Sequence, residues 1–181
     1  MPVGNGFIVL DTGTRRELAH SAYNTRREEC ETASAILGVS ALRDASLEML
    51  EAKKSELSET VYRRARHVIT ENERVAAFSE AMRTGNRRRM GELIDACHAS
   101  LDQDYEVSSR ELNIIAEISR RHPACLGARM TGAGFGGCAL AVVETDKLEG
   151  FEEFVSSVYL AETGIEARIF RVEAGDGVRL L

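Results

Sequence analysis

The hydrophobic positions of this chain follow three successive patterns. Residues 6–12 form a short β-branched run between two turn signals, which predicts a strand. From residue 16 to residue 122, apolar side chains recur three or four positions apart, and this spacing predicts amphipathic helices. Beyond Pro123 the pattern predicts strand, strand, helix and strand, at residues 126–131, 138–144, 148–160 and 166–172.

Capping residues and helix breakers divide the helical region. A side-chain oxygen at the N-cap accepts a backbone N–H, and glycine or proline ends a helix. The expected boundaries are residue 16 to Gly38 for a first helix, Ser46 to Gly85 for a long second one, Asn86 for the start of a third, and Ser108 or Ser109 to His122 for a fourth.

The order of these elements predicts the fold class. Helices followed by strand, strand, helix and strand most simply form an antiparallel sheet with helices on one face, an α+β fold. The 181 residues, 44% of them hydrophobic, suffice for one core, and neither a linker nor a repeat interrupts them. We therefore expect a single domain over residues 1–181.

Charge and cysteine usage narrow the function. The net charge of −6 argues against binding to nucleic acid, and no apolar run approaches the roughly 20 residues that span a membrane. The first residues lack the pattern of a signal peptide. We expect no metal site and a cytoplasmic location with reduced thiols, because the four cysteines lack metal-ligand spacing; they are Cys30, Cys97, Cys125 and Cys138.

A glycine-rich stretch from Arg129 to Glu144, RMTGAGFGGCALAVVE, raises the question of a phosphate site. Gly132, Gly134 and Gly137 satisfy the dinucleotide fingerprint G-x-G-x-x-G, but that site needs a helix after the loop, where a strand is predicted here. The sequence also lacks the signatures of protein kinases and of the Walker loop. A tight hairpin turn and a loop beside a phosphate both remain open on these grounds.

Several motifs, taken in order, resemble the GHMP small-molecule kinases. The segment MTGAGFGGCALAVV is similar to their third signature motif, and its Phe-Gly-Gly-Cys part points to the galactokinases among them. The segments DTGTRRELAHSAYNTRREECETA, RRARHVITENERV and GELIDACHASLDQDYEVS are similar to further galactokinase segments and follow in that family's order. The resemblance extends from Val3 to Val172 and covers the C-terminal half of these kinases only.

The resemblance implies a ferredoxin-like GHMP-kinase C-terminal domain. Its antiparallel sheet is expected to have four strands and its helical segment to cover residues 16–122, with strand 6–12 inside this domain or at its junction with the next. The ATP phosphate loop and the catalytic residues belong to the other half of such a kinase. We therefore expect no catalytic residue here, a missing N-terminal domain as partner, and a chain that is inactive alone.

The implied reaction of the parent enzyme is phosphoryl transfer from ATP, with Mg²⁺, to the anomeric hydroxyl of galactose. Such a transfer depends on positioning and on electrostatic stabilisation. The alternative is a non-catalytic regulatory protein of the same fold that responds to a sugar or a nucleotide. An isolated half would also expose apolar surface that its partner domain covers, and we expect self-association from that.

The resemblance also implies the site residues. Tyr23 matches the tyrosine that contacts the sugar, whereas its spacing alone predicts a core aromatic beside Cys30 and Leu37. Arg15 matches a basic residue near the nucleotide, and a solvated surface arginine is the alternative. The remaining residues beside the nucleotide are Thr131, Gly132, Ala133, Gly134, Phe135, Gly136 and Gly137.

One position departs from the family's pattern. Ala133 stands where these kinases usually have glycine, so either its φ is negative or the loop has shifted.

We interpret two charged clusters as structural features rather than as ligand sites. Asp102, Asp104 and Glu106 lie near His98 in the sequence, and we interpret them as a helix end with a solvated turn rather than a metal site. The arginines of NRRRM, residues 86–90, are interpreted as the exposed start of a helix with acidic neighbours such as Glu92.

Overall fold

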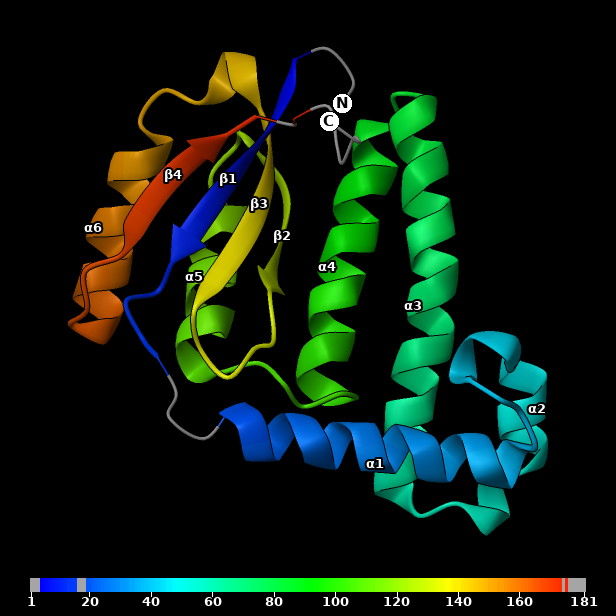
Figure 1. Ribbon diagram of the computed structural model, residues 1–181. Helices are drawn as coiled ribbons and strands as arrows, with labels where there is room; N and C mark the ends of the chain where they lie inside the picture. The colour runs from blue at the N-terminus through cyan, green and yellow to red at the C-terminus, as the bar shows by residue number, and fades with distance from the viewer. Residues whose placement is uncertain (1–3, 16–18, 174, 176–181) are drawn as a thin grey trace, which may run out of the picture.

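The structure, a computed structural model, describes residues 4–15, 19–173 and 175, and Figure 1 shows how its elements are arranged. The strands are β1 (Asn5–Asp11), β2 (Cys125–Thr131), β3 (Cys138–Glu144) and β4 (Arg168–Val172). The α-helices are α1 (Ala19–Leu37), α2 (Leu47–Ala52), α3 (Glu59–Arg83), α4 (Arg87–Gln103), α5 (Arg110–Arg121) and α6 (Phe151–Thr163). Short 3-10 helices occupy Leu42–Asp44, Lys54–Glu56 and Thr145–Lys147.

The four strands form one antiparallel sheet in the order β2-β3-β1-β4. β1 is an interior strand, in which Phe7 pairs with Val142 of β3 and with Val172 of β4. Helices connect β1 to β2 and β3 to β4, and this βαββαβ order is the ferredoxin-like arrangement. The predicted α+β class and ferredoxin-like sheet are therefore confirmed.

The main core lies between one face of the sheet and helices α5 and α6. Successive side chains of a strand point to opposite faces, so alternate residues of each strand enter this core. The sheet contributes Ile8, Leu10, Ala128, Met130, Ala139 and Ala141, each at most 1% exposed. The helices contribute Leu112, Ile115, Phe151, Val155 and Tyr159.

Helix α4 packs on the opposite face of the sheet, beside β2. Met90, Leu93 and Ile94 of α4 form a cluster with Val142, which points away from the main core. A Cβ atom added at Gly91 would lie 2.0 Å from the Leu126 carbonyl oxygen, so only glycine allows this approach of helix to strand. The expectation of helices on one face only is therefore wrong.

A second cluster of buried residues joins α1, α2 and α3 at some distance from the sheet. It consists of Ala33, Leu37, Leu42, Leu50, Tyr62, Ala65 and Ile69. Figure 1 shows α1 lying across the ends of α3 and α4, below the sheet. The helix that carries Tyr23 is thus held by other helices rather than by strands.

Most predicted helix starts are confirmed by their capping bonds. Ser46 Oγ accepts from Met49 N, Asn86 Oδ1 from Arg89 N and Ser109 Oγ from Leu112 N. The first helix was predicted from residue 16, and residues 16–18 lie outside the described part of the chain. No described helix is long and apolar enough to cross a membrane.

The long second helix predicted over residues 46–85 is wrong, because the chain breaks it in two. α2 ends at Ala52, and α3 begins only after Ser58, whose Oγ accepts from Val61 N. Two smaller shifts occur near the C-terminus. α6 begins at Phe151 rather than at 148, and β4 begins at Arg168 rather than at 166.

Replacing Gly91 with alanine is expected to destabilise the protein by about 1–3 kcal/mol, because the new methyl group meets the Leu126 carbonyl. In an unconstrained helix the same change would stabilise by about 1 kcal/mol. Urea unfolding measures the difference. Ala96→Gly at an exposed position of α4 gives the ordinary cost of glycine, and a stabilising Gly91→Ala would contradict the close approach.

Candidate functional site

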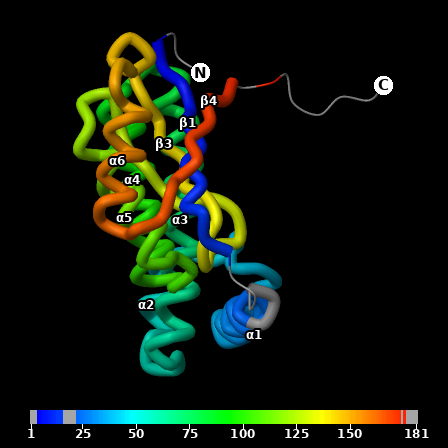
Figure 2. The backbone as a smooth tube through the Cα atoms, turned by 90° about the vertical axis from the view of Figure 1, so that its left-hand side faces the viewer, coloured from blue at the N-terminus to red at the C-terminus, as the bar shows by residue number. Residues whose placement is uncertain are grey.

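The glycine loop, residues 131–137, connects β2 to β3 at the end of the sheet that faces α1 (Figures 1 and 2). The chain segment after β1 holds one side of it. Gly137 O accepts from Thr12 N at 2.9 Å and from Thr12 Oγ1 at 2.7 Å, and Gly137 N donates to Thr14 O at 3.0 Å. The loop therefore closes on the residues that lead from β1 toward Arg15.

The connection between α4 and α5 holds the other side of the loop. Phe135 N donates to Val107 O at 2.7 Å, and a Cβ atom at Gly134 would lie 2.1 Å from the same oxygen. Gly134 also has a φ of +83°, which favours glycine. Because Gly134 has no side chain, the backbones of two segments that are far apart in the sequence can approach each other closely here.

Phe135 has an unusual backbone conformation that the sequence analysis missed. Its φ is 61°, in the left-handed region that residues other than glycine rarely adopt. The residue is 7% exposed and is part of the main core. A buried aromatic ring next to the tip of the loop therefore anchors the loop in the core. A large apolar residue between glycines is the sequence signal that indicates such an anchor.

Ala133 fits the loop without strain. Among the described residues, the positive φ angles outside glycine belong to Glu106 and Phe135, so Ala133 has a negative φ. The first of the two alternatives for this position is therefore correct. Gly132 and Ala133 form the exposed tip of the loop, where a ligand can approach the backbone.

Arg15 lies beside the glycine loop and is held in place. Its guanidinium donates to both carboxylate oxygens of Asp11 at 2.8 Å and to Thr14 O at 2.9 Å. The Asp11 side chain is 6% exposed and also accepts from Arg168 Nη2 at 2.7 Å. The Arg15 guanidinium holds the pKa of Asp11 well below its usual range. Two arginines against one buried carboxylate leave this end of the sheet positively charged.

Tyr23 is 58% exposed on α1, so its interpretation as a core aromatic beside Cys30 and Leu37 is wrong. Tyr23 is among the neighbours that raise the pKa of Tyr105, for which burial is the main cause. Tyr105 belongs to the same α4–α5 connection that holds the glycine loop, so Tyr23 and the loop both lie near that connection.

The acidic residues at the end of α4 are only partly in solvent, and all three have polar partners. Asp104 is buried, accepts from Ser100 Oγ at 3.0 Å and pairs with Arg66. Glu106 binds arginines of α3, and Asp102 accepts from Asn113 Nδ2 at 2.8 Å. The part of that interpretation that placed these acids in solvent is therefore wrong for Asp104, whereas Glu106 is exposed and Asp102 is partly buried.

The NRRRM stretch is placed as expected. Arg88 and Arg89 are exposed and pair with Glu92, and Arg87 pairs with Glu144 at 2.8 Å.

Within the described residues, no group of three or more His, Cys, Asp or Glu side chains could hold a metal ion.

Comparisons with known proteins bear on this site. A family model described as GHMP kinases C terminal matches residues 78–160. The chain is 43% identical over 180 residues to a galactokinase of Exiguobacterium sibiricum, covering 97% of this chain and 46% of that protein. It is 41% identical over 182 residues to a galactokinase of Lactiplantibacillus plantarum, covering 98% and 47%. The chain thus spans about half the length of these curated relatives.

Solved structures show the same relation. The Lactococcus lactis galactokinase complexed with galactose superimposes with a TM-score of 0.90 at 37% identity, over 96% of this chain and 46% of that one. A mevalonate kinase of L. major in complex with R-mevalonate has a TM-score of 0.57 at 20% identity, which shows a shared fold.

A buried histidine supports the strand that enters the glycine loop. His98 Nδ1 accepts from Met130 N at 3.0 Å, so the ring must be neutral at that nitrogen. The pKa of His98 is lowered to about 4, mainly by burial and in part by Arg120, whereas Asp102 and Asp95 oppose the shift.

Stability is expected to fall as the pH drops from 6.5 toward 4. The unfolded chain takes up a proton at His98 below its ordinary pKa of 6.5, whereas the folded chain resists until about 4. The loss for this residue amounts to at most about 3 kcal/mol. Urea unfolding at a series of pH values measures it. The variant His98→Asn keeps a neutral hydrogen-bond acceptor and should make the free energy of unfolding less dependent on pH between 6.5 and 4. An unchanged pH dependence would contradict the role given to His98.

Proposed function

We propose that this chain, whose residues 78–160 match the family model described as GHMP kinases C terminal, forms the C-terminal portion of a galactokinase. The observation that carries the proposal is 43% identity to a galactokinase across 97% of the chain. The proposed parent reaction is the transfer of a phosphoryl group from ATP to the anomeric hydroxyl of galactose. A non-catalytic regulatory role is not favoured, because these relatives are kinases by name.

We assign the sugar side of the site to Tyr23. A phenol is both donor and acceptor on a rigid ring, which suits the recognition of a sugar hydroxyl. Its exposure of 58% on a helix held by other helices supports this role. The galactose in the related Lactococcus lactis structure is consistent with a sugar site in such a protein.

We assign the nucleotide side to the glycine loop and Arg15. The loop is fixed from two sides while its tip at Gly132 and Ala133 is exposed, so it can shape the floor of a site by its backbone. Arg15 adds a guanidinium, which can donate hydrogen bonds to a phosphate or a purine. Phosphoryl transfer depends on such positioning and charge rather than on covalent chemistry by the protein.

The chain alone is proposed to be inactive. Bound with ATP, Mg²⁺ would neutralise phosphate charge, but the described residues contain no acidic cluster to hold the ion. Its ligands would then come from the nucleotide and from the remaining part of the enzyme. We propose a cytoplasmic location, supported by four cysteines that are all free.

Fusing this chain behind the N-terminal portion of the Exiguobacterium sibiricum galactokinase is expected to restore ATP-dependent phosphorylation of galactose, measured as ADP release. In this fusion Tyr23→Phe should raise the KM for galactose about three- to tenfold, since one hydrogen bond to the sugar is lost. Tyr62→Phe, which loses a bond to Glu51 far from the site, is the matched control with an unchanged KM. A folded fusion that binds ATP but transfers nothing to galactose would overturn the proposal, as would turnover by the chain alone.

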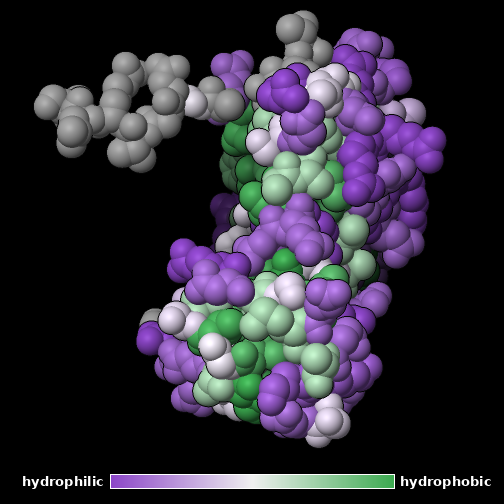
Figure 3. Space-filling model, turned by 90° about the vertical axis from the view of Figure 1, so that its right-hand side faces the viewer, coloured by the Kyte–Doolittle hydropathy of each residue, from purple (hydrophilic) through white to green (hydrophobic). Residues whose placement is uncertain are grey.

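One face of the sheet has the character of a covered surface. Val9 pairs with Leu140 on one side and with Phe170 on the other, which places the three on the face opposite the main core. Phe170 is 48% exposed, and next to this row Phe7 and Val75 line a groove of 220 Å³. Figure 3 shows hydrophobic surface at the left edge of the upper part of the molecule. We propose that the remaining part of the enzyme covers this open face and that the isolated chain self-associates through it.

The isolated chain is expected to show a mass above that of the monomer in light scattering, rising with concentration through the micromolar range. Phe170→Glu should restore the monomer, because a charge cannot be buried there without a partner. Leu160→Glu is the control, since Leu160 is 45% exposed on α6 at the other side of the sheet. A monomer mass at every concentration would contradict self-association.

A further inference from the structure

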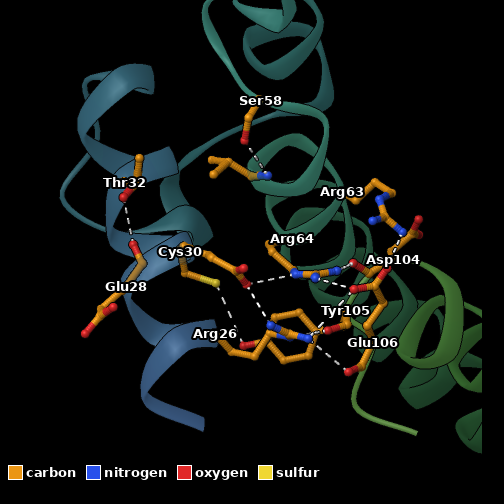
Figure 4. Close-up of polar contacts among 12 residues, drawn as sticks. Arg26, Glu28, Cys30, Thr32, Ser58, Arg63, Arg64, Asp104, Tyr105 and Glu106 are labelled. Atoms are coloured by element: carbon orange, nitrogen blue, oxygen red, sulfur yellow. Dashed lines mark hydrogen bonds and ion pairs between the residues drawn. The ribbon is translucent and has the colours of Figure 1, made fainter. Parts of the chain in front are cut away.

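We propose that Arg64 is a positioning residue of this kinase, which holds Tyr23 and the glycine loop in one fixed relation. The inference rests on the function proposed above. Arg64 belongs to α3 and contacts neither the loop nor Tyr23 in the bonds described below. It binds instead the two segments that carry them, as Figure 4 shows.

The first of these segments is α1. Arg64 Nε donates to Glu29 Oε2 at 2.9 Å, and Arg26 Nη1 donates to the same oxygen at 3.0 Å. Glu29 is on α1 together with Tyr23. The carboxylate therefore ties the helix that presents the sugar-contacting phenol to α3.

The second segment comprises residues 104–107, between α4 and α5. Arg64 Nη1 donates to the Asp104 carbonyl oxygen, and Arg64 Nη2 to Glu106 Oε2 at 2.5 Å. Glu106 has a φ of 52°, a conformation that costs free energy in a residue with a side chain. Its contacts with the arginine therefore hold a backbone bend that the residue would not adopt by preference.

This bend leads directly to the glycine loop. Val107 follows Glu106, and its carbonyl oxygen accepts from Phe135 N at 2.7 Å. Arg26 of α1 reinforces the link, because its Nε donates to Tyr105 O at 2.5 Å and its Nη2 to Glu106 O at 3.1 Å. A continuous set of bonds thus runs from α1 through Arg64 to the loop.

The chemistry of the guanidinium suits this task. Arg64 is 2% exposed, and its planar fork reaches three acceptors on two segments at once. A lysine ammonium is a point charge that cannot span all three. Buried ionic clusters are weak evidence for stability, whereas a fixed arrangement of charged partners suits the specification of geometry.

The experiment compares Glu29→Gln and Arg64→Lys with a matched control. The control is Glu71→Gln on α3, where Glu71 Oε2 accepts from Arg74 Nε at 2.6 Å and the side chain is 21% exposed against 18% for Glu29. In the chain itself, amide hydrogen exchange of Phe135 should be about three- to thirtyfold faster in the two test variants. Exchange of Phe154 in α6 is the internal reference and should not change.

The fusion enzyme supplies the functional readout. Glu29→Gln should raise the KM for galactose by about three- to thirtyfold with the KM for ATP nearly unchanged, and Glu71→Gln should alter neither. Equal effects of all three variants on Phe135 exchange, or faster exchange with an unchanged KM for galactose in an active fusion, would overturn the positioning role. In the latter case the proposed function stands, because the unmodified fusion still phosphorylates galactose.

Discussion

The hydrogen bond from Phe135 N to the Val107 carbonyl oxygen is the contact on which the arrangement of the site depends. It joins a loop of the sheet to the connection between two helices. The approach is so close that only glycine fits at position 134, and the buried ring of Phe135 keeps the loop from withdrawing. Because the bond is between backbone groups, it fixes the path of the chain while leaving the loop tip exposed.

Arginines near the site are paired with carboxylates, both where they are exposed, as Arg15 is, and where they are buried, as Arg64 is. Asp11 orients Arg15 at the end of β1, and Glu29 and Glu106 surround Arg64 between the helices. Held arginines lose less conformational freedom when a ligand binds, so part of the ordering cost is met on folding.

The sequence predicts the elements of this fold well where local chemistry decides them. Ser46, Asn86 and Ser109 begin helices because a cap needs only neighbouring backbone groups. The prediction from the sequence fails at residues 53–58. Apolar residues keep a helical spacing across this stretch, although Ser58 caps the start of a new helix there. Such breaks depend on packing against residues that are distant in the sequence, and apolar periodicity does not reveal that packing.

The site was predicted less completely than the fold, for a similar reason. The resemblance to a kinase family selected Tyr23 and the glycine loop, and the structure shows the first exposed and the second fixed. Arg64 was missed because arginine is usually a surface residue. It lies at helical spacing between Val61 and Val68 on the stripe of α3, so an arginine within an apolar stripe is the signal that indicates a buried charge.

The separation of the two hydrophobic cores has a consequence for how such a protein can evolve. Among the described residues, the cluster beneath the sheet and the cluster of α1, α2 and α3 share no buried side chain. Mutational effects at distant sites without shared partners are nearly additive. The two clusters do share partners, however, because Arg64 binds both Glu29 of α1 and Glu106 of the α4–α5 connection. Selection can therefore repack Leu50 or Ile69 without a change in the strands only while these ion pairs are kept. Each cluster can thus vary on its own within one chain, provided that the residues of this ionic link stay the same.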